Sequence, residues 1–109
     1  MTVQEFAKRF DMKILNGDEP DREIRDCYIG DLLSWVMSRA PADSAWLTVM
    51  GNINSIAVAT LADVSCIVLV ENAALDENAR AKAEMHEVNI LLSKENSYHL
   101  AVKLHELLS

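Results

Sequence analysis

The sequence predicts an α/β fold of three layers, in which a mostly parallel sheet lies between helices on both faces. Residues 66–70 form an unbroken apolar, largely β-branched run (CIVLV), as expected of a central parallel strand that is covered on both sides. Amphipathic segments precede and follow this run, and the connections between them are only a few residues long. Alternating strands and helices with short connections are typical of right-handed βαβ units. The length of 109 residues suits one such domain, spanning residues 1–109.

The N-terminal quarter of the chain predicts a helix, a short strand and an exposed loop. Thr2 and Glu5 have the spacing of a capping box, and apolar residues recur at helical intervals as far as Phe10. A strand over residues 12–15 then stops at the Asn-Gly turn dipeptide that follows it. Residues 18–26 carry five carboxylates and two arginines. This composition predicts a solvated loop whose arginines pair with neighbouring carboxylates.

Strands and helices alternate through the rest of the chain. Strands are predicted over residues 26–29, 46–50, 66–70 and 88–92. Helices are predicted over residues 30–39, 53–62, 76–87 and 97–108. Asn52 is expected to cap the second of these helices. We expect the strands that begin near Trp46, Cys66 and Val88 to pair in parallel.

Acidic residues outnumber basic ones in the composition. Lys and Arg number 10 and Asp and Glu 17, which gives a formal net charge of −7. Without a cluster of basic residues, such a chain is poorly suited to bind nucleic-acid backbones or anionic membranes. No apolar run is long enough to span a membrane, and the polar N-terminus lacks the pattern of a signal peptide. We therefore expect a cytoplasmic protein.

Few residues offer catalytic chemistry. The three glycines of the chain are too scattered to form a phosphate-binding loop. The three histidines lack the spacing of metal ligands, and no serine lies in a nucleophile elbow. Cys27 and Cys66 are isolated within apolar, strand-like segments, which predicts unreactive thiols without a disulfide. The sequence thus names no catalytic residue, metal ligand or cofactor, and predicts a protein that is not an enzyme.

The carboxyl ends of the predicted parallel strands favour a small polar ligand. Ligands of open parallel sheets bind beyond these ends, where the N-termini of helices converge. The candidate ligand residues are Gly51, Asn52, Asn72, Ser93 and Lys94. They offer close backbone approach, hydrogen bonds and one positive charge. In the alternative interpretation, Asn52 and Ser93 are only helix caps and turn residues.

Two predicted helices carry more apolar surface than one face of a sheet covers. The apolar arc of residues 32–37 spans about 200°, and that of residues 53–61 is nearly as wide, whereas packing on a sheet needs little more than about 100°. This surplus predicts a homodimer, because exposed apolar patches usually mark interfaces. The candidate interface residues are Trp35, Ile53, Ile56 and Val58. In the alternative, the N-terminal helix and the charged loop cover the surplus.

Several segments resemble a known family in their sequence and order. They are residues 21–24 (DREI), 28–37 (YIGDLLSWVM), 45–48 (AWLT), 56–59 (IAVA), 67–70 (IVLV) and 91–93 (LLS). Together they resemble the DRTGG domain family, over residues 12–108. The chain departs from the family pattern at residues 25–26, where glycines are common, and around residues 51–52, where a histidine is common.

The resemblance implies a fold like that of the N-terminal domain of HPr kinase/phosphorylase. Such domains also occur in phosphotransacetylases and beside CBS modules in regulated pyrophosphatases, where the catalytic residues lie elsewhere. Short versions occur near iron-only hydrogenase genes, so the candidate protein partners include redox or hydrogenase-associated enzymes. With the apolar surplus, the resemblance predicts a non-catalytic, stand-alone regulatory or interaction module that acts as a homodimer. The alternative is a sensor that binds an adenine nucleotide or a similar anion at the strand ends.

Overall fold

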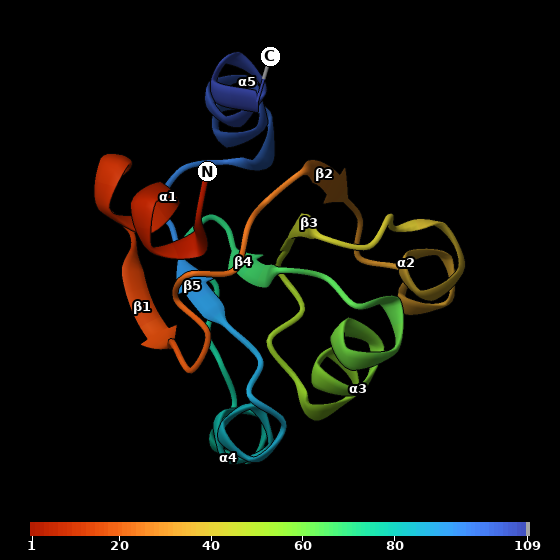
Figure 1. The fold of residues 1–109 in the computed structure, drawn as a ribbon. Helices are drawn as coiled ribbons and strands as arrows, with labels where there is room; N and C mark the ends of the chain where they lie inside the picture. Colours follow the sequence, from red (N-terminus) through yellow and green to blue (C-terminus); the bar gives the residue numbers. More distant parts are fainter. Residues whose placement is uncertain (109) are drawn as a thin grey trace.

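A single sheet lies at the centre of the fold, with helices on both of its faces (Figure 1). In the computed structural model, which describes residues 1–108, five strands form this sheet in the order β1-β5-β4-β3-β2. The strands are β1 (Lys13–Asn16), β2 (Asp26–Ile29), β3 (Ser44–Thr48), β4 (Cys66–Leu69) and β5 (Ile90–Leu92). The helices are α1 (Val3–Arg9), α2 (Leu33–Arg39), α3 (Ile53–Ala62), α4 (Glu77–His86) and α5 (Ser97–Leu108). The predicted α/β class is confirmed.

The strands β2 to β5 run in parallel and follow the order of the chain. Each pairs with the next, with Trp46 of β3 opposite Ile67 of β4. These pairings confirm the predicted parallel arrangement of the strands near Trp46, Cys66 and Val88. β1 lies on the far side of β5 and runs antiparallel to it, with its first residue, Lys13, opposite the last residue of β5.

The sequential strand order decides which helices cover which face. A right-handed crossover between neighbouring parallel strands places its helix on the same face whenever the chain steps in the same direction. Accordingly α2, α3 and α4 share one face, where Ile56 packs in a core cluster with Trp46. α1 and α5 cover the opposite face, where Phe6 and Leu100 pack with Leu47. Both predicted helical layers are present, but crossovers supply only one of them.

The central strand β4 is buried along its whole length, as its apolar sequence predicted. Cys66 and Val68 face the α1 and α5 layer, whereas Ile67 and Leu69 face the layer of crossover helices. This alternation follows from the pleat of a strand, which points successive side chains to opposite faces. A strand covered on both faces therefore needs apolar residues at every position.

Side-chain caps start α1 and α3 at the predicted residues. The hydroxyl oxygen of Thr2 accepts the amide of Glu5 at 3.1 Å, and the Glu5 carboxylate accepts the amide of Thr2 at 3.0 Å. The side-chain oxygen of Asn52 accepts the amides of Asn54 and Ser55 at 3.0 and 3.1 Å. Each cap satisfies backbone N–H groups that the first turn of a helix leaves without an acceptor.

The strand β5 begins at Ile90, later than its predicted start at Val88. The amide of Val88 donates to the carbonyl of Ala83 at 2.9 Å, and Glu87 has a left-handed φ of 57°. Val88 therefore belongs to the C-terminal cap of α4, because the 6→1 hydrogen bond of such a cap uses the amide that a strand would use.

The wide apolar arc of α3 is covered within the chain itself. α3 packs between α2 and α4, so its apolar side chains contact the sheet and both neighbouring helices. Ile56 and Val58 are only 1% and 8% exposed, which leaves almost no surface for a partner. This corrects the expectation that these residues belong to an interface. Trp35 and Ile53 are 51% and 42% exposed and stay available.

The cysteines lie on the same face of the sheet but cannot form a bridge without a shift of the backbone. Cys27 and Cys66 are both paired with Ala45, one from each side, so they are two strand spacings apart. Two spacings amount to roughly 9.5 Å, whereas the Cα atoms of a disulfide are usually less than about 7 Å apart. Burial raises the pKa of the Cys27 thiol to about 11 and that of the Cys66 thiol to about 12. Both cysteines are free.

The thiols are expected to react slowly with Ellman's reagent in the native protein. At pH 8 a thiol with a pKa of about 11 is roughly one part in a thousand thiolate, which is the reactive form. Labelling of Cys66, which is fully buried, further requires the fold to open. Single-cysteine variants, Cys27→Ala and Cys66→Ala, resolve the two rates, and the Cys66 thiol is expected to be the slower. Rapid labelling of Cys66 in the absence of denaturant would contradict its burial.

Candidate functional site

The carboxyl ends of β4 and β5 bring three of the predicted ligand residues together. Asn72 follows β4, and Ser93 and Lys94 follow β5. All three line a cleft of about 640 Å³, which we call the carboxyl-edge cleft. Residues 10–12, between α1 and β1, also line it, together with Lys13 of β1 and Lys103 of α5. The antiparallel pairing of β1 with β5 brings the start of β1 to this edge.

Backbone hydrogen bonds hold together the two connections that border this cleft. The amides of Glu71 and Asn72 donate to the carbonyls of Glu95 and Ser93, each at 2.9 Å. Glu71 and Asn72 have φ angles of 55° and 57°, in the left-handed region that asparagine enters more readily than most residues. Ser93 is buried, and its hydroxyl oxygen accepts the amide of Glu95 at 3.1 Å. Ser93 therefore has the turn role of the alternative interpretation, while Asn72 and Lys94 are exposed.

Positive charge gathers at the cleft, although the chain is acidic overall. Lys13, Lys94 and Lys103 line it. The ammonium of Lys103 is paired with the Glu95 carboxylate and lies 5.5 Å from the centroid of the Phe10 ring. Lys13 and Lys94 form no ion pair with any residue between 1 and 108. The cleft therefore presents two lysines that are unpaired within the described chain, and a third, paired lysine lies near an aromatic ring.

Gly51 and Asn52 are not among the residues that line this cleft. A Cβ atom on Gly51 would lie 2.1 Å from the carbonyl oxygen of Ala74, so the glycine permits contact with another part of the backbone. The Gly51 carbonyl also accepts the amide of Asp76 at 2.9 Å. Asn52 uses its side-chain oxygen to cap α3. In the described structure Gly51 therefore allows two backbone segments to approach each other, and Asn52 caps a helix.

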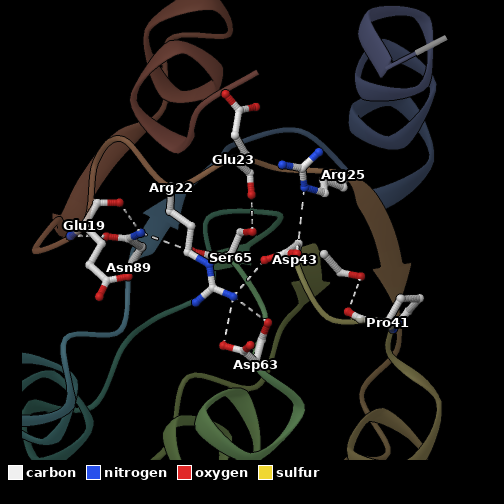
Figure 2. Close-up of polar contacts among 10 residues, drawn as sticks. Glu19, Arg22, Glu23, Arg25, Pro41, Asp43, Asp63, Ser65 and Asn89 are labelled. Carbon is white, nitrogen blue, oxygen red and sulfur yellow. Dashed lines mark hydrogen bonds and ion pairs between the residues drawn. The ribbon is translucent and has the colours of Figure 1, made fainter.

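A second polar cluster lies at the amino-terminal edge of the parallel strands, and the sequence analysis missed it (Figure 2). The loop of residues 17–25 crosses this edge between β1 and β2. Arg22 extends from the loop toward Asp43, which precedes β3, and Asp63, which follows α3. These three residues, with Ser65 and Asn89, form what we call the Arg22 cluster.

The guanidinium of Arg22 bridges two turns. One of its nitrogens donates to a carboxylate oxygen of Asp43 at 3.1 Å, to one of Asp63 at 2.9 Å and to the Asp63 carbonyl at 2.7 Å. Asp43 and Asp63 have left-handed φ angles of 63° and 57°. Partial burial acts to lower the pKa of Arg22, but the hydrogen bonds to both carboxylates outweigh it and raise that pKa. Arg22 therefore pairs with remote carboxylates rather than with neighbours in its own loop, which corrects the prediction.

The remaining members of the cluster fasten the backbone of the loop. The side-chain amide of Asn89 donates to the carbonyls of Glu19 and Ser65 at 2.7 and 3.1 Å, and its oxygen accepts the amide of Glu19 at 3.0 Å. The hydroxyl of Ser65 donates to the carbonyl of Glu23. Ile24 is only 1% exposed, so part of the loop belongs to the core and the expectation of a solvated loop was wrong there. The sequence did offer a signal for this cluster: Ser65 and Asn89 are polar residues that stand directly before the apolar segments of β4 and β5.

Comparison with known proteins identifies the family. The DRTGG domain matches residues 5–107 of the chain. The chain belongs to the DRTGG domain family. The match confirms the resemblance that the segments at residues 21–24 and 28–37 carry. In this DRTGG domain, Asp21 and Arg22 lie in the loop that the Arg22 cluster fastens, and Arg22 has a structural role.

A solved structure supports the fold of the domain. The chain superposes with a TM-score of 0.71 and 7% sequence identity on the crystal structure of the CBS and DRTGG domains from the regulatory region of Clostridium perfringens pyrophosphatase, complexed with its activator, diadenosine tetraphosphate. The match covers 93% of this chain and 44% of that one, so the chain spans less than half of its length. Such a domain is therefore found in the regulatory region of an enzyme. No curated protein matches the chain.

The described residues show neither a membrane span nor a metal cluster. No helix within residues 1–108 is long and apolar enough to cross a membrane. In the same part of the chain, no group of three or more His, Cys, Asp or Glu side chains is placed to hold a metal ion.

Substitution of Arg22 by Met tests the cluster, because it keeps the apolar stem and removes the hydrogen bonds to Asp43 and Asp63. We expect the free energy of unfolding in urea to fall by about 1–2 kcal/mol, since partial exposure weakens such pairs. The control is Arg25→Met. Arg25 is 71% exposed and lies 3.9 Å from Asp43, so its loss is expected to cost less than about 0.5 kcal/mol. Equal losses in the two variants would contradict the bridging role.

Substitution of Gly51 by Ala tests the backbone role of this glycine. The added Cβ collides with the backbone of Ala74, so we expect the free energy of unfolding to fall by about 1–3 kcal/mol. Thermal unfolding without any ligand measures this loss. Gly17→Ala is the matched control. There the added Cβ meets only a side-chain methyl, Cγ2 of Ile14, at 2.8 Å, and that side chain is 45% exposed, so it can shift at a smaller cost than backbone. A Gly51→Ala variant as stable as Gly17→Ala would show that the close contact is not required.

Proposed function

We propose that this DRTGG domain is a non-catalytic regulatory module that acts as a homodimer. The observation that carries the proposal is the exposed apolar surface along the β2 side of the sheet. Membership of a family that is found in the regulatory region of an enzyme supports the regulatory part. Docking to a further protein, including a redox enzyme, stays a prediction.

The two edges of the sheet differ in how open they are. β1 carries Lys13 and has an irregular register between Ile14 and Asn16, both of which discourage a further strand from pairing there. β2 pairs in regular register with β3, and its other side has no strand partner among the described residues. The β2 edge is therefore the one that accepts another strand.

Apolar side chains flank the β2 edge on both faces of the sheet. On the α5 side, Ile29, Tyr98 and Val102 line a groove of about 510 Å³ and are 50%, 71% and 41% exposed. On the other side, Leu32 and Trp35 are 58% and 51% exposed at the start of α2. Such a concentration of apolar surface along one edge is typical of an interface.

Two-fold symmetry suits an edge of this kind. Two copies related by a two-fold axis normal to the sheet place their β2 strands antiparallel to each other, in the arrangement that edge strands use for pairing. The pairing satisfies backbone groups of β2, and the flanking side chains of α2 and α5 are buried at the same time. Trp35, one of the predicted interface residues, is half exposed on α2, with the guanidinium of Arg39 3.8 Å from the centroid of its ring.

A ligand sensor is the second candidate, and the carboxyl-edge cleft favours it. The cleft gathers Asn72, Ser93 and Lys94 at the edge where parallel sheets bind ligands. The ligand of the alternative hypothesis is an adenine nucleotide or a similar anion. The activator of the similar pyrophosphatase region, diadenosine tetraphosphate, belongs to the same chemical class, which supports that alternative.

Substitutions at the β2 side are expected to dissociate the dimer. Sedimentation equilibrium at micromolar concentration should show a dimer for the original chain. Trp35→Glu and Tyr98→Glu each place a charge in the apolar surface. We expect each to reduce the free energy of dimerisation by about 2 kcal/mol or more, which is a roughly thirtyfold weaker association. Met85→Glu is the control, because Met85 is 78% exposed but lies on α4, away from the β2 edge. Far-ultraviolet circular dichroism checks that each variant is folded.

A strictly monomeric original chain would overturn the homodimer. A dimer that Trp35→Glu and Tyr98→Glu leave intact, while Met85→Glu weakens it, would move the interface to α4.

A further inference from the structure

We infer that the carboxyl-edge cleft binds a small organic anion, whose charged group lies among Lys13, Lys94 and Lys103 and whose apolar part packs against Phe10. The charged group is a carboxylate or a phosphate ester, and the apolar part is flat and small. The inference rests on the second proposed function, the ligand sensor, and names the chemical class of its ligand.

The charge of the cleft is the first support. Three lysines line it, against the carboxylates of Asp11 and Glu95, so the lining carries a formal charge of +1 in a chain of −7. Lys94 has neither an ion pair nor a hydrogen bond among residues 1–108, and its backbone N–H lacks an acceptor there too. An anion at this position gains charge-assisted hydrogen bonds, which are stronger than those between neutral groups.

Glu95 provides the second support, because its carboxylate already pairs with Lys103 at the cleft. The side chains of Lys103 and Glu95 are 44% and 31% exposed, so the pair is accessible to a ligand. An incoming carboxylate or phosphate has the same chemistry as Glu95 and competes with it for the ammonium group. Glu95 therefore acts as an internal competitor that lowers the affinity for the ligand.

The apolar wall is the third support. The ring of Phe10 packs edge to face against the buried ring of Phe6, with centroids 5.6 Å apart, so the core holds it in position. Met12 and Leu92 extend the apolar lining. The volume of about 640 Å³ lies within the range of roughly 300–1,000 Å³ that is usual for small-molecule sites. An inorganic ion would leave this wall without contact.

Titration of the full chain by two-dimensional proton–nitrogen NMR tests the inference with four probes, and adenosine monophosphate is titrated separately as a probe of the sensor. Phenyl phosphate and benzoate carry both an aromatic ring and an anionic group, inorganic phosphate lacks the ring, and benzyl alcohol lacks the charge. We expect both aromatic anions to shift the amide resonances of Asn72 and Lys94 with saturation, and to bind more tightly than the other two probes. The difference between phenyl phosphate and benzoate shows whether phosphate or carboxylate is preferred.

Three variants locate the binding group. Lys94→Gln is expected to weaken phenyl phosphate binding about tenfold, the effect of one lost charge-assisted hydrogen bond. Glu95→Gln is expected to tighten binding severalfold, because it frees Lys103 without altering the shape of the cleft. Lys82→Gln removes the same charge from α4, outside the cleft, and is expected to leave the affinity unchanged.

Three results would overturn the inference, and they differ in what they imply for the sensor. Benzyl alcohol binding at the cleft as tightly as phenyl phosphate would reject the anion but keep the cleft as a ligand site. Failure of all four probes and of adenosine monophosphate to shift cleft resonances would reject the sensor as well. Equal weakening by Lys94→Gln and Lys82→Gln would show that net charge, rather than the cleft, attracts the anion.

Discussion

Right-handed crossovers between β2, β3, β4 and β5 place α2, α3 and α4 on one face of the sheet, and the rest of the structure follows from this constraint. The opposite face receives no crossover helix, so α1 and α5 cover it from the two ends of the described chain. Because β1 and β2 are opposite edges of the sheet, the loop of residues 17–25 has to cross its full width. Arg22 and Asn89 fasten this loop through polar contacts at the amino-terminal edge.

Both proposed functional surfaces lie away from the amino-terminal edge. The carboxyl-terminal edge is open at the cleft, and the β2 edge is open along its side, and α5 borders both of them. Lys103 of α5 lines the carboxyl-edge cleft, while Tyr98 and Val102 of the same helix line the apolar groove beside β2. The helix packs on the sheet through Leu100 and Leu104, both fully buried. The proposed ligand surface and the proposed association surface therefore share one structural element.

Only part of the candidate site was accessible to sequence reasoning. The rule that ligands bind at the carboxyl ends of parallel strands placed Asn72, Ser93 and Lys94 at the same edge, and the structure brings them into one cleft. The rule did not separate them from Gly51 and Asn52, because a residue that caps a helix or meets a backbone looks the same in sequence as one that meets a ligand. Residues 10–13 and Lys103 joined the cleft only through antiparallel pairing of β1 and packing of α5.

The sequence by itself determined the α/β class, the parallel central strands, the family and the starts of α1 and α3, because these depend on local patterns of burial and capping. Tertiary structure alone decided the partners of Arg22, whose carboxylates at Asp43 and Asp63 lie far along the chain. It also decided that Val58 is buried whereas Trp35 is half exposed, although both lie on strongly apolar helices. The physical reason is position within the layer: α3 has a helix on each side, whereas α2 lies at its end beside the open strand β2.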